Sequence, residues 1–283
     1  TGANALRVGM FSHQGHAYYP SRIAPEAPFL DGRNLLQEFE LACKRRDVYL
    51  TVYLNSKWVS EDFYRQHPDW LVSYRDGPFT FRTVDPDTKL VIYPMCPCSP
   101  FIDYYEQIVR EVVSKSSPDA IYVDNFAIMP FCECRYCRER YGAEIPERRN
   151  WNSRETRRYL KWLADESKVI AKSIVAAARS RIAEMPVVFN RGQFWSVTGT
   201  FSPEDNRDYA HQIADMIHAE SAVRFYGESF RHINEQCAFG RSIDTSVWTW
   251  VEYGAYPFSY VSCPSRETKI KAAKVMANGG RPM

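Results

Sequence analysis

Ala120-Ile121-Tyr122-Val123-Asp124-Asn125 is the stretch that decides the fold of this chain. Its four apolar residues, two of them β-branched, are typical of a short strand that is buried on both faces. Apolar residues at helical spacing predict a helix over Phe101–Ser114, just before it. A buried strand that follows a helix and ends in a carboxylate indicates a parallel α/β protein.

The same alternation continues outward from this strand in both directions. Five further strands are predicted at Leu6–Ser12, Val48–Leu54, Pro186–Phe189, Met216–Ala219 and Thr245–Trp250. Helices are predicted at Gly32–Arg46, Thr156–Ala183, Glu204–Ile213, Gly227–Phe239 and Arg266–Ala277, and the last is followed by Asn278-Gly279-Gly280 as a C-cap. One helical turn is expected at Asp62–Arg65, and the proline-rich stretch Tyr93–Pro100 is expected to be irregular.

Polar side chains follow the predicted strands where each of them ends: His13, Asn55, Asp124, Asn190, Glu220 and Glu252. An open doubly wound sheet would carry a glycine-rich loop after its first strand, and Ser12-His13-Gln14-Gly15-His16 is no such loop. The pattern therefore predicts one (β/α)₈ TIM barrel domain over residues 1–283. Because only six strands are clear, we expect the first strand–helix unit and the end of the last strand to be missing.

The amino-acid composition narrows the kinds of molecule that we expect this chain to bind. The 283 residues carry a net charge of only +2, which argues against a dedicated nucleic-acid surface. No apolar run approaches the roughly 20 residues of a membrane span, and no signal peptide is visible, so we expect no membrane partner and a cytoplasmic location. Because the chain starts at Thr1, a removed segment remains open, as does a homo-oligomer. An aromatic content of 14% beside many charged residues suits a carbohydrate substrate.

The cysteines fall in two tight groups. Cys132, Cys134 and Cys137 form a C-x-C-x-x-C pattern, which can converge on one ion and then needs a fourth ligand for tetrahedral zinc. Cys96 is the natural fourth ligand, with Cys98 as the alternative. A site filled by four sulfurs would make the metal structural rather than catalytic. The competing interpretation is a set of buried free thiols.

Two family resemblances rest on these residues. Tyr93–Pro100, Asp124-Asn125 and the C-x-C-x-x-C cluster together resemble the zinc-containing family 42 β-galactosidases, and this resemblance favours Cys96 over Cys98 as the fourth ligand. In that family the acid/base Glu follows the Asp-Asn pair, whereas this chain has Phe126.

The second resemblance is to family 29 α-L-fucosidases. Ser12–Ser21 resembles their His-His-Gly…Pro-Ser segment, and Ala120–Asp124 resembles the strand that ends in their nucleophilic aspartate. His67–Trp70, the cysteine cluster and Ala277–Gly280 are similar to a group of hypothetical barrel glycoside hydrolases related to both families. These resemblances imply a glycoside hydrolase with Asp124 as its nucleophile.

Glycoside hydrolysis usually needs two carboxyl groups on opposite sides of the scissile bond. We predict a retaining exo-glycosidase for a fucoside- or galactoside-like substrate, with Asp124 as nucleophile and Glu220 as general acid/base. Glu252 is the second candidate for acid/base. The competing interpretations are a capping role for Asp124 and a salt bridge for Glu220.

Further strand-end residues are candidates for binding the sugar: His13, His16, Asn125, Asn190, Arg191 and Trp248. Imidazole, amide and guanidinium groups donate to hydroxyls, and an indole ring stacks on a sugar face. Solvated histidines and a core tryptophan are the alternatives. Because Phe126 replaces an expected acid, a non-hydrolytic carbohydrate-binding barrel remains the alternative function.

Overall fold

A computed structural model of the chain describes residues 4–75, 77–78, 81–82, 91–147, 153–190, 212–219, 229–242, 247–249, 251, 254–255 and 258–282. Contacts divide the chain into two compact units, Thr1–Thr83 with Thr88–Val187 and Val84–Asp87 with Val188–Met283. Each unit is described by itself. The single domain expected over residues 1–283 stays a prediction.

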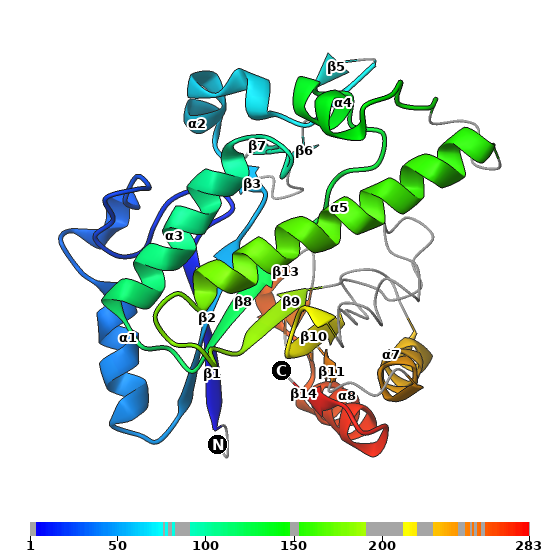
Figure 1. The fold of residues 1–283 in the computed structure, drawn as a ribbon. Coiled ribbons are helices and arrows are strands. Elements are labelled where there is room, and N and C mark those ends of the chain that lie inside the picture. Colours follow the sequence, from blue (N-terminus) through cyan, green and yellow to red (C-terminus); the bar gives the residue numbers. More distant parts are fainter. Residues whose placement is uncertain are drawn as a thin grey trace. The chain divides into compact units, whose positions relative to one another are not determined.

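Parallel strands form the centre of the first unit. They are β1 (Ala5–Phe11), β2 (Tyr49–Asn55) and β8 (Ala120–Asp124), adjacent in that order (Figure 1). All five residues of β8 are buried, as expected for a parallel strand covered on both faces. The register pairs Tyr53 with Tyr122 and Asn55 with Asp124. Since residues two apart on a strand share a face, these four side chains lie on one face of the sheet.

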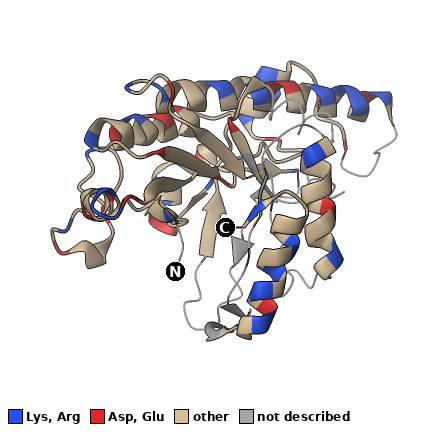
Figure 2. Ribbon diagram, turned by 90° about the horizontal axis from the view of Figure 1, so that it is seen from below, with Lys and Arg blue, Asp and Glu red and all other residues tan. Residues whose placement is uncertain are grey.

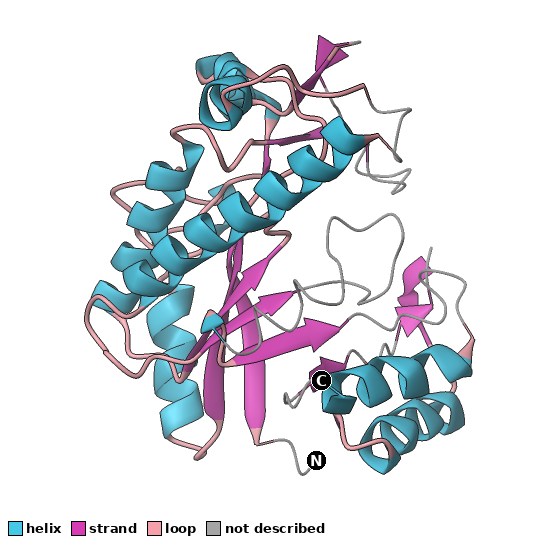
Figure 3. Ribbon diagram, turned by 45° about the vertical axis from the view of Figure 1, so that its right-hand side comes forward, coloured by secondary structure: helices cyan, strands magenta, loops and turns pink. Residues whose placement is uncertain are grey.

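Three helices pack around these strands. α1 (Leu35–Lys44) lies against β1 and β2, while α3 (Phe101–Lys115) and α5 (Arg154–Ala178) lie side by side (Figures 1 and 3). The predicted apolar stripe of α3 is buried, and the hydroxyl of Tyr105 donates to the carbonyl of Leu54 at 3.3 Å. This contact fastens α3 to the carboxyl end of β2, beside the strand end that carries Asp124.

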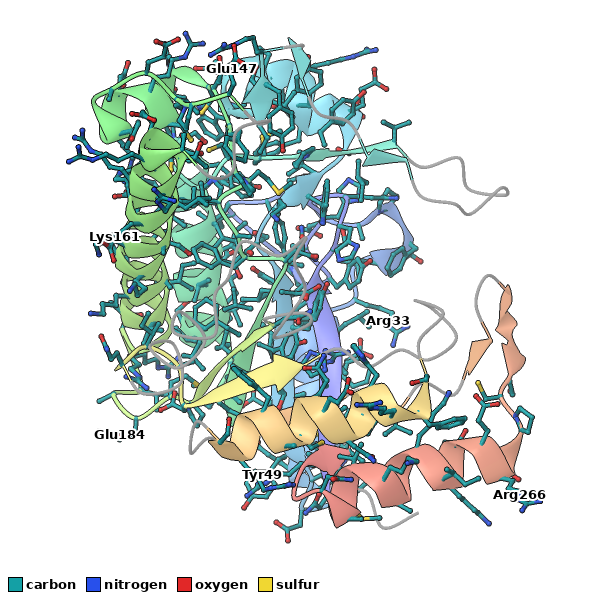
Figure 4. The ribbon with its side chains drawn as sticks, turned by 90° about the vertical axis from the view of Figure 1, so that its right-hand side faces the viewer. Arg33, Tyr49, Glu147, Lys161, Glu184 and Arg266 are labelled. Atoms are coloured by element: carbon teal, nitrogen blue, oxygen red, sulfur yellow. The ribbon has the colours of Figure 1, made fainter. Side chains whose placement is uncertain are left out.

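The long helix α5 begins where the sequence has a basic stretch. The Ser153 hydroxyl accepts the backbone N–H of Thr156 at 3.0 Å, which satisfies one of the unpaired N–H groups at the helix start. Arg154, Arg157 and Arg158 are exposed, and Figure 2 shows basic and acidic residues interspersed along this helix. Lys161, labelled in Figure 4, lies on the outer side of α5. This charged stripe is therefore a solvated helix face.

A buried carboxylate holds the segment that leads from β1 to α1. Glu111 of α3 accepts hydrogen bonds from the hydroxyls of Tyr19 and Ser21, at 3.2 and 2.5 Å, and from the backbone N–H of Arg22, at 2.8 Å. Burial and the adjacent carboxylate raise the pKa of Tyr19, so its hydroxyl remains a donor at neutral pH. Glu111 thus anchors the loop that follows His13.

Replacing Glu111 by Ala is expected to lower the free energy of unfolding by about 3 kcal/mol, because buried donors lose their acceptor. Denaturant unfolding measures the change. The matched control is Glu106→Ala on the same helix, whose partner Arg110 is at the i+4 position and half exposed, and which should cost well under 1 kcal/mol. Equal losses in the two variants would contradict the anchoring role.

Short elements connect β2 to α3. They are β3 (Trp58–Val59), α2 (Glu61–Gln66), η2 (Pro68–Trp70), β4 (Ser73–Tyr74), β5 (Gly77–Pro78), β6 (Phe81–Arg82) and β7 (Val91–Pro94). The expectation that Tyr93–Pro100 is irregular is wrong at its start, because β7 pairs antiparallel with β3 and β6. Pro94 is tolerated as the last strand residue, where its carbonyl accepts the N–H of Val72 at 2.9 Å.

The second unit has parallel strands in the order β9 (Val187–Asn190), β10 (Met216–Ala219), β11 (Val247–Thr249) and β14 (Arg281–Pro282). The first residue of β9 closes the first unit. α7 (Phe230–Ser242) and α8 (Ser265–Ala277) pack together through Ile233, Cys237 and Val275, and β12 (Gly254–Ala255) pairs antiparallel with β13 (Phe258–Ser262). The predicted helix Glu204–Ile213 lies largely outside the described residues.

Glycines end α8 as the sequence predicts. Gly279 has a φ of 75°, the left-handed conformation that closes a helix. Gly280 approaches α7 so closely that a Cβ atom there would lie 2.6 Å from the Cys237 sulfur. Only glycine fits this position without a shift of the neighbouring helix.

The predicted parallel α/β class is confirmed, and the six predicted strands and the predicted long helices that fall in the described residues lie within a few residues of their predicted bounds, whereas β3 to β7, β12 and β13 were not predicted. The closed barrel and its missing ends stay predictions. None of the described helices combines the length and apolar character that crossing a membrane requires.

Candidate active site and metal centre

Asp124 is the last residue of β8, and its side chain is 11% exposed. The chain turns sharply after it, because Asn125 adopts a left-handed backbone conformation with a φ of 60°. Asparagine tolerates this conformation better than most residues. The turn places two successive polar side chains at one strand end.

Hydrogen-bond donors converge on one oxygen of the Asp124 carboxylate. The Tyr53 hydroxyl donates to Oδ2 in a short hydrogen bond, and the Asn125 amide donates to the same oxygen at 2.7 Å. His13 Nε2 lies 3.6 Å from Oδ2, 2.6 Å from the Tyr53 hydroxyl and 3.1 Å from the Asn125 amide nitrogen. The His13 side chain is 47% exposed, so this group of four residues reaches solvent through the imidazole.

Tyr53 is the site residue that sequence reasoning missed. Its ring stacks on Tyr122 with centroids 5.6 Å apart, and the Arg7 guanidinium lies 4.5 Å from the Tyr122 ring centroid. Burial, followed by the Asp124 charge and hydrogen bond, raises the pKa of Tyr53, so the phenol remains a donor. One feature of the sequence could have identified it: side chains alternate between the two faces of a strand, so Tyr53 lies on the same face of β2 as Asn55.

The segment after β2 holds the backbone of Asp124 through its carbonyl group. Ser56 donates to the Asp124 carbonyl twice, through its backbone N–H at 3.0 Å and its hydroxyl at 2.6 Å. The buried Asn55 amide donates to the carbonyls of Ser12 and Trp58, at 3.0 and 2.7 Å. These contacts link the ends of β1, β2 and β8, and so fix the backbone that carries His13 and Asp124.

Lys57 continues this segment into the interior. It is 6% exposed, and its ammonium lies 3.6 Å from the sulfur of Met129 and 5.8 Å from the ring centroid of Trp58. Burial lowers the pKa of Lys57 to about 8, against the opposing influence of negative charge on Asp124 and Cys96. Sequence reasoning missed this residue as well, because a lysine gives no sign of its burial.

Of the remaining predicted site residues, the structure describes only His16 and Asn190 with their side chains. His16 is half buried, with its pKa lowered by burial in spite of the Asp62 carboxylate nearby. Asn190 ends β9 in the second unit. Glu220, Glu252 and Arg191 lie outside the described residues, as does the side chain of Trp248. Phe126, which stands where the family 42 acid would be, is buried at 2% exposed.

Four buried thiols form the second cluster. The sulfurs of Cys96, Cys132, Cys134 and Cys137 all lie within 4.8 Å of one another, and Cys96 is 3.4 Å from Cys137. Cys98 is buried and interacts with Cys96 and Cys137, but it is outside the set of four. Hydrogen bonds from the neighbouring thiols lower the pKa of Cys134. A compact set of four sulfur donors fits a tetrahedral metal ion.

Local structure shapes this thiol cluster. Cys134 is the N-cap of α4 (Arg135–Tyr141), a helix that the sequence analysis did not predict, and its sulfur accepts the N–H of Cys137 at 3.4 Å. Phe131 adopts a φ of 62°, which is rare for an aromatic residue. Its N–H donates to the Tyr159 hydroxyl at 2.8 Å, and the two rings stack. α5 therefore holds the turn that presents Cys132.

A glycosyl hydrolase family model matches the N-terminal part of the chain. Residues 1–125 match the family model described as "Hypothetical glycosyl hydrolase 6". The matched segment runs from β1 through β2 and α3 to Asp124 and Asn125, and so contains the carboxylate and its donors. The predicted likeness to a hypothetical glycoside hydrolase group is confirmed. No curated protein sequence matches the chain.

Solved glycosidases share the fold over the whole chain. α-L-Fucosidase isoenzyme 2 from Paenibacillus thiaminolyticus is 18% identical at a TM-score of 0.70 and aligns with 99% of this chain and 40% of its own. The β-galactosidase from Bacillus circulans sp. alkalophilus is 13% identical at a TM-score of 0.70, and the alignment covers 99% of this chain and 45% of the β-galactosidase. A β-galactosidase from Halorubrum lacusprofundi is 12% identical at a TM-score of 0.73, and the alignment covers 99% of this chain and 48% of that enzyme.

The two predicted families, fucosidases and β-galactosidases, are thus both found among the structural neighbours, which are TIM-barrel glycosidases. At these identities the likeness concerns the fold. The chain spans less than half the length of each of these three relatives.

Proposed function

We propose that this chain is the barrel of a retaining exo-glycosidase with Asp124 as its nucleophile. The observation that carries the proposal is the Asp124 carboxylate at the end of a buried parallel strand, with two donors on Oδ2 and His13 beside it. Carboxyl ends of barrel strands are where catalytic groups of this fold lie. The glycosyl hydrolase match over residues 1–125 includes this strand.

The donors favour a nucleophile over an acid. Hydrogen bonds from Tyr53 and Asn125 stabilise the ionised carboxylate, and only that form can attack the anomeric carbon. In the proposed reaction an Asp124 oxygen forms a bond to the anomeric carbon while the bond to the leaving oxygen breaks. Tyr53 and Asn125 keep the carboxylate in one orientation throughout.

A second carboxyl group must protonate the leaving oxygen and then activate water. We assign this role to Glu220, with Glu252 as the second candidate, because both follow predicted strands. A separation of about 5 to 5.5 Å from Asp124 would suit retention.

The sugar is proposed to be fucoside- or galactoside-like, in keeping with the substrates that the names of the neighbours give. We assign the binding of the sugar hydroxyls to His13 and Asn125, because the His13 ring nitrogen lies 3.1 Å from the Asn125 amide and 3.6 Å from the Asp124 carboxylate. His16, Asn190, Arg191 and Trp248 complete the proposed set.

The four-thiol cluster is proposed to hold a structural zinc ion through Cys96, Cys132, Cys134 and Cys137. With four sulfur ligands the ion has no open position for substrate. It would hold the turn after Asp124 against the segment before α3.

A panel of nitrophenyl glycosides tests the reaction and the sugar together. Hydrolysis of an α-fucoside or a galactoside is expected, and NMR of the first-formed sugar should show retained anomeric configuration. First-formed sugar of inverted configuration would refute the nucleophile assignment. Specific binding of these sugars without hydrolysis of any of them would support the carbohydrate-binding alternative instead.

Replacing Tyr53 by Phe is expected to reduce kcat/KM about 10- to 100-fold, because a hydrogen bond to a charged group contributes roughly 1.5 to 3 kcal/mol. The acidic limb of the pH–rate profile should move to higher pH, since the carboxylate loses a donor that favours its ionised form. Steady-state kinetics across pH measure both effects.

The matched control is Tyr49→Phe, the same change on the same strand at a residue that is 62% exposed. It should leave kinetics and pH profile unchanged. A Tyr53→Phe enzyme with wild-type kinetics would remove Tyr53 from the site.

A further inference from the structure

Lys57 is a buried cation without a carboxylate partner of its own. It lies two residues after the end of β2 and is 6% exposed. Among the described residues, the only hydrogen-bond partner of its ammonium is the sulfur of Met129 at 3.6 Å, and it makes no ion pair there. An unpaired buried charge is costly, so the fold must supply negative charge from another source.

The segment around Lys57 joins the two clusters described above. Ser56 donates twice to the carbonyl of Asp124, and the Lys57 carbonyl accepts the N–H of Met95 at 2.8 Å. Met95 immediately precedes Cys96, whose own N–H donates to the Trp70 carbonyl at 2.8 Å. Asp124 and Cys96 are the groups whose negative charge acts on the ammonium. The ammonium itself contacts Met129, whose carbonyl accepts the N–H of Cys132 at 3.3 Å, so Lys57 is tied to both segments that carry the thiols.

A zinc ion would leave this region with an excess of negative charge. Four thiolates and one divalent ion carry a net charge of −2, and all four sulfurs are buried away from water. Groups outside the ligand set that balance such charge tune the affinity of the site. Among the described residues, the exposed Arg140 also interacts with the charge on Cys96, whereas the Lys57 ammonium that does so is buried.

We propose that Lys57 is a buried counter-cation of the metal–thiolate centre. The inference rests on the proposed zinc centre. When metal is bound, the thiolates supply negative charge that balances the buried ammonium.

The test compares zinc affinity in the whole chain by competition with a chromophoric chelator. Lys57→Met fills a similar volume without charge and is expected to bind zinc about 10- to 100-fold more weakly, the range found for outer partners of metal ligands. Lys57→Arg keeps the charge and should stay within a few-fold of wild type. Met129→Leu, which removes the sulfur contact but no charge, should also stay near wild type.

The possible results distinguish a failure of the counter-cation role from a failure of the proposed zinc centre. If the wild-type chain takes up no zinc, the metal centre itself is wrong and the inference fails with it. If wild type binds zinc and Lys57→Met binds equally well, only the counter-cation role is overturned. A Lys57→Met variant that folds, as shown by circular dichroism, yet binds zinc weakly supports the proposal whether or not any glycoside is hydrolysed.

Discussion

Asp124→Asn is expected to reduce kcat on the order of 10³-fold or more, because removing an attacking group abolishes the covalent step. Sugar binding should survive, since the amide keeps the shape of the side chain and can still accept from Tyr53. Stopped or continuous assays with a nitrophenyl glycoside measure the rate, and titration calorimetry measures the binding.

Two controls sharpen this result. Asp103→Asn makes the same chemical change at an exposed residue of the first turn of α3 and should leave kcat unaltered. Asp124→Ala with added azide should recover turnover and release a glycosyl azide of inverted configuration, because azide fills the place of the missing nucleophile. Wild-type kcat in Asp124→Asn would refute the assignment.

Removal of zinc is expected to lower the melting temperature by roughly 8 to 16 °C. A ligand present at a thousand times its Kd stabilises the folded state by about 4 kcal/mol. For a domain of this size each kcal/mol shifts the melting temperature by roughly 2 to 4 °C. Metal analysis after purification without chelator, followed by melting curves with and without chelator, makes the measurement.

The two cysteines of the proline-rich segment provide a matched pair. Cys96→Ser should lose zinc and melt at the temperature of the chelated protein, whereas Cys98→Ser should keep one zinc per chain. Their thiols are both buried and only two residues apart, so a general effect of burial cannot explain a difference. Equal zinc content in the two variants would show that Cys96 is not the required ligand.

Local patterns in the sequence were sufficient to predict most of the longer helices and the parallel strands. The bounds of β8 and β10 and the position of α3 follow from apolar runs and helical spacing over a few residues, which act within one segment. The sequence missed α4, a short helix without a clear apolar stripe that depends on Cys134 as its cap. It also missed β7, because pairing with two distant strands outweighs its proline.

The sequence by itself determined the α/β alternation, the carboxylate at the end of Ala120–Asp124 and the three closely spaced thiols, because each depends on contacts or periodicity within one short segment. Only the tertiary structure decided which distant groups meet them. Tyr53 reaches Asp124 across 71 positions through the register of β2 with β8, Cys96 joins Cys132 across 36, and Lys57 is buried against the sulfur of Met129. Such contacts depend on strand pairing and loop packing, which leave no local pattern in the chain.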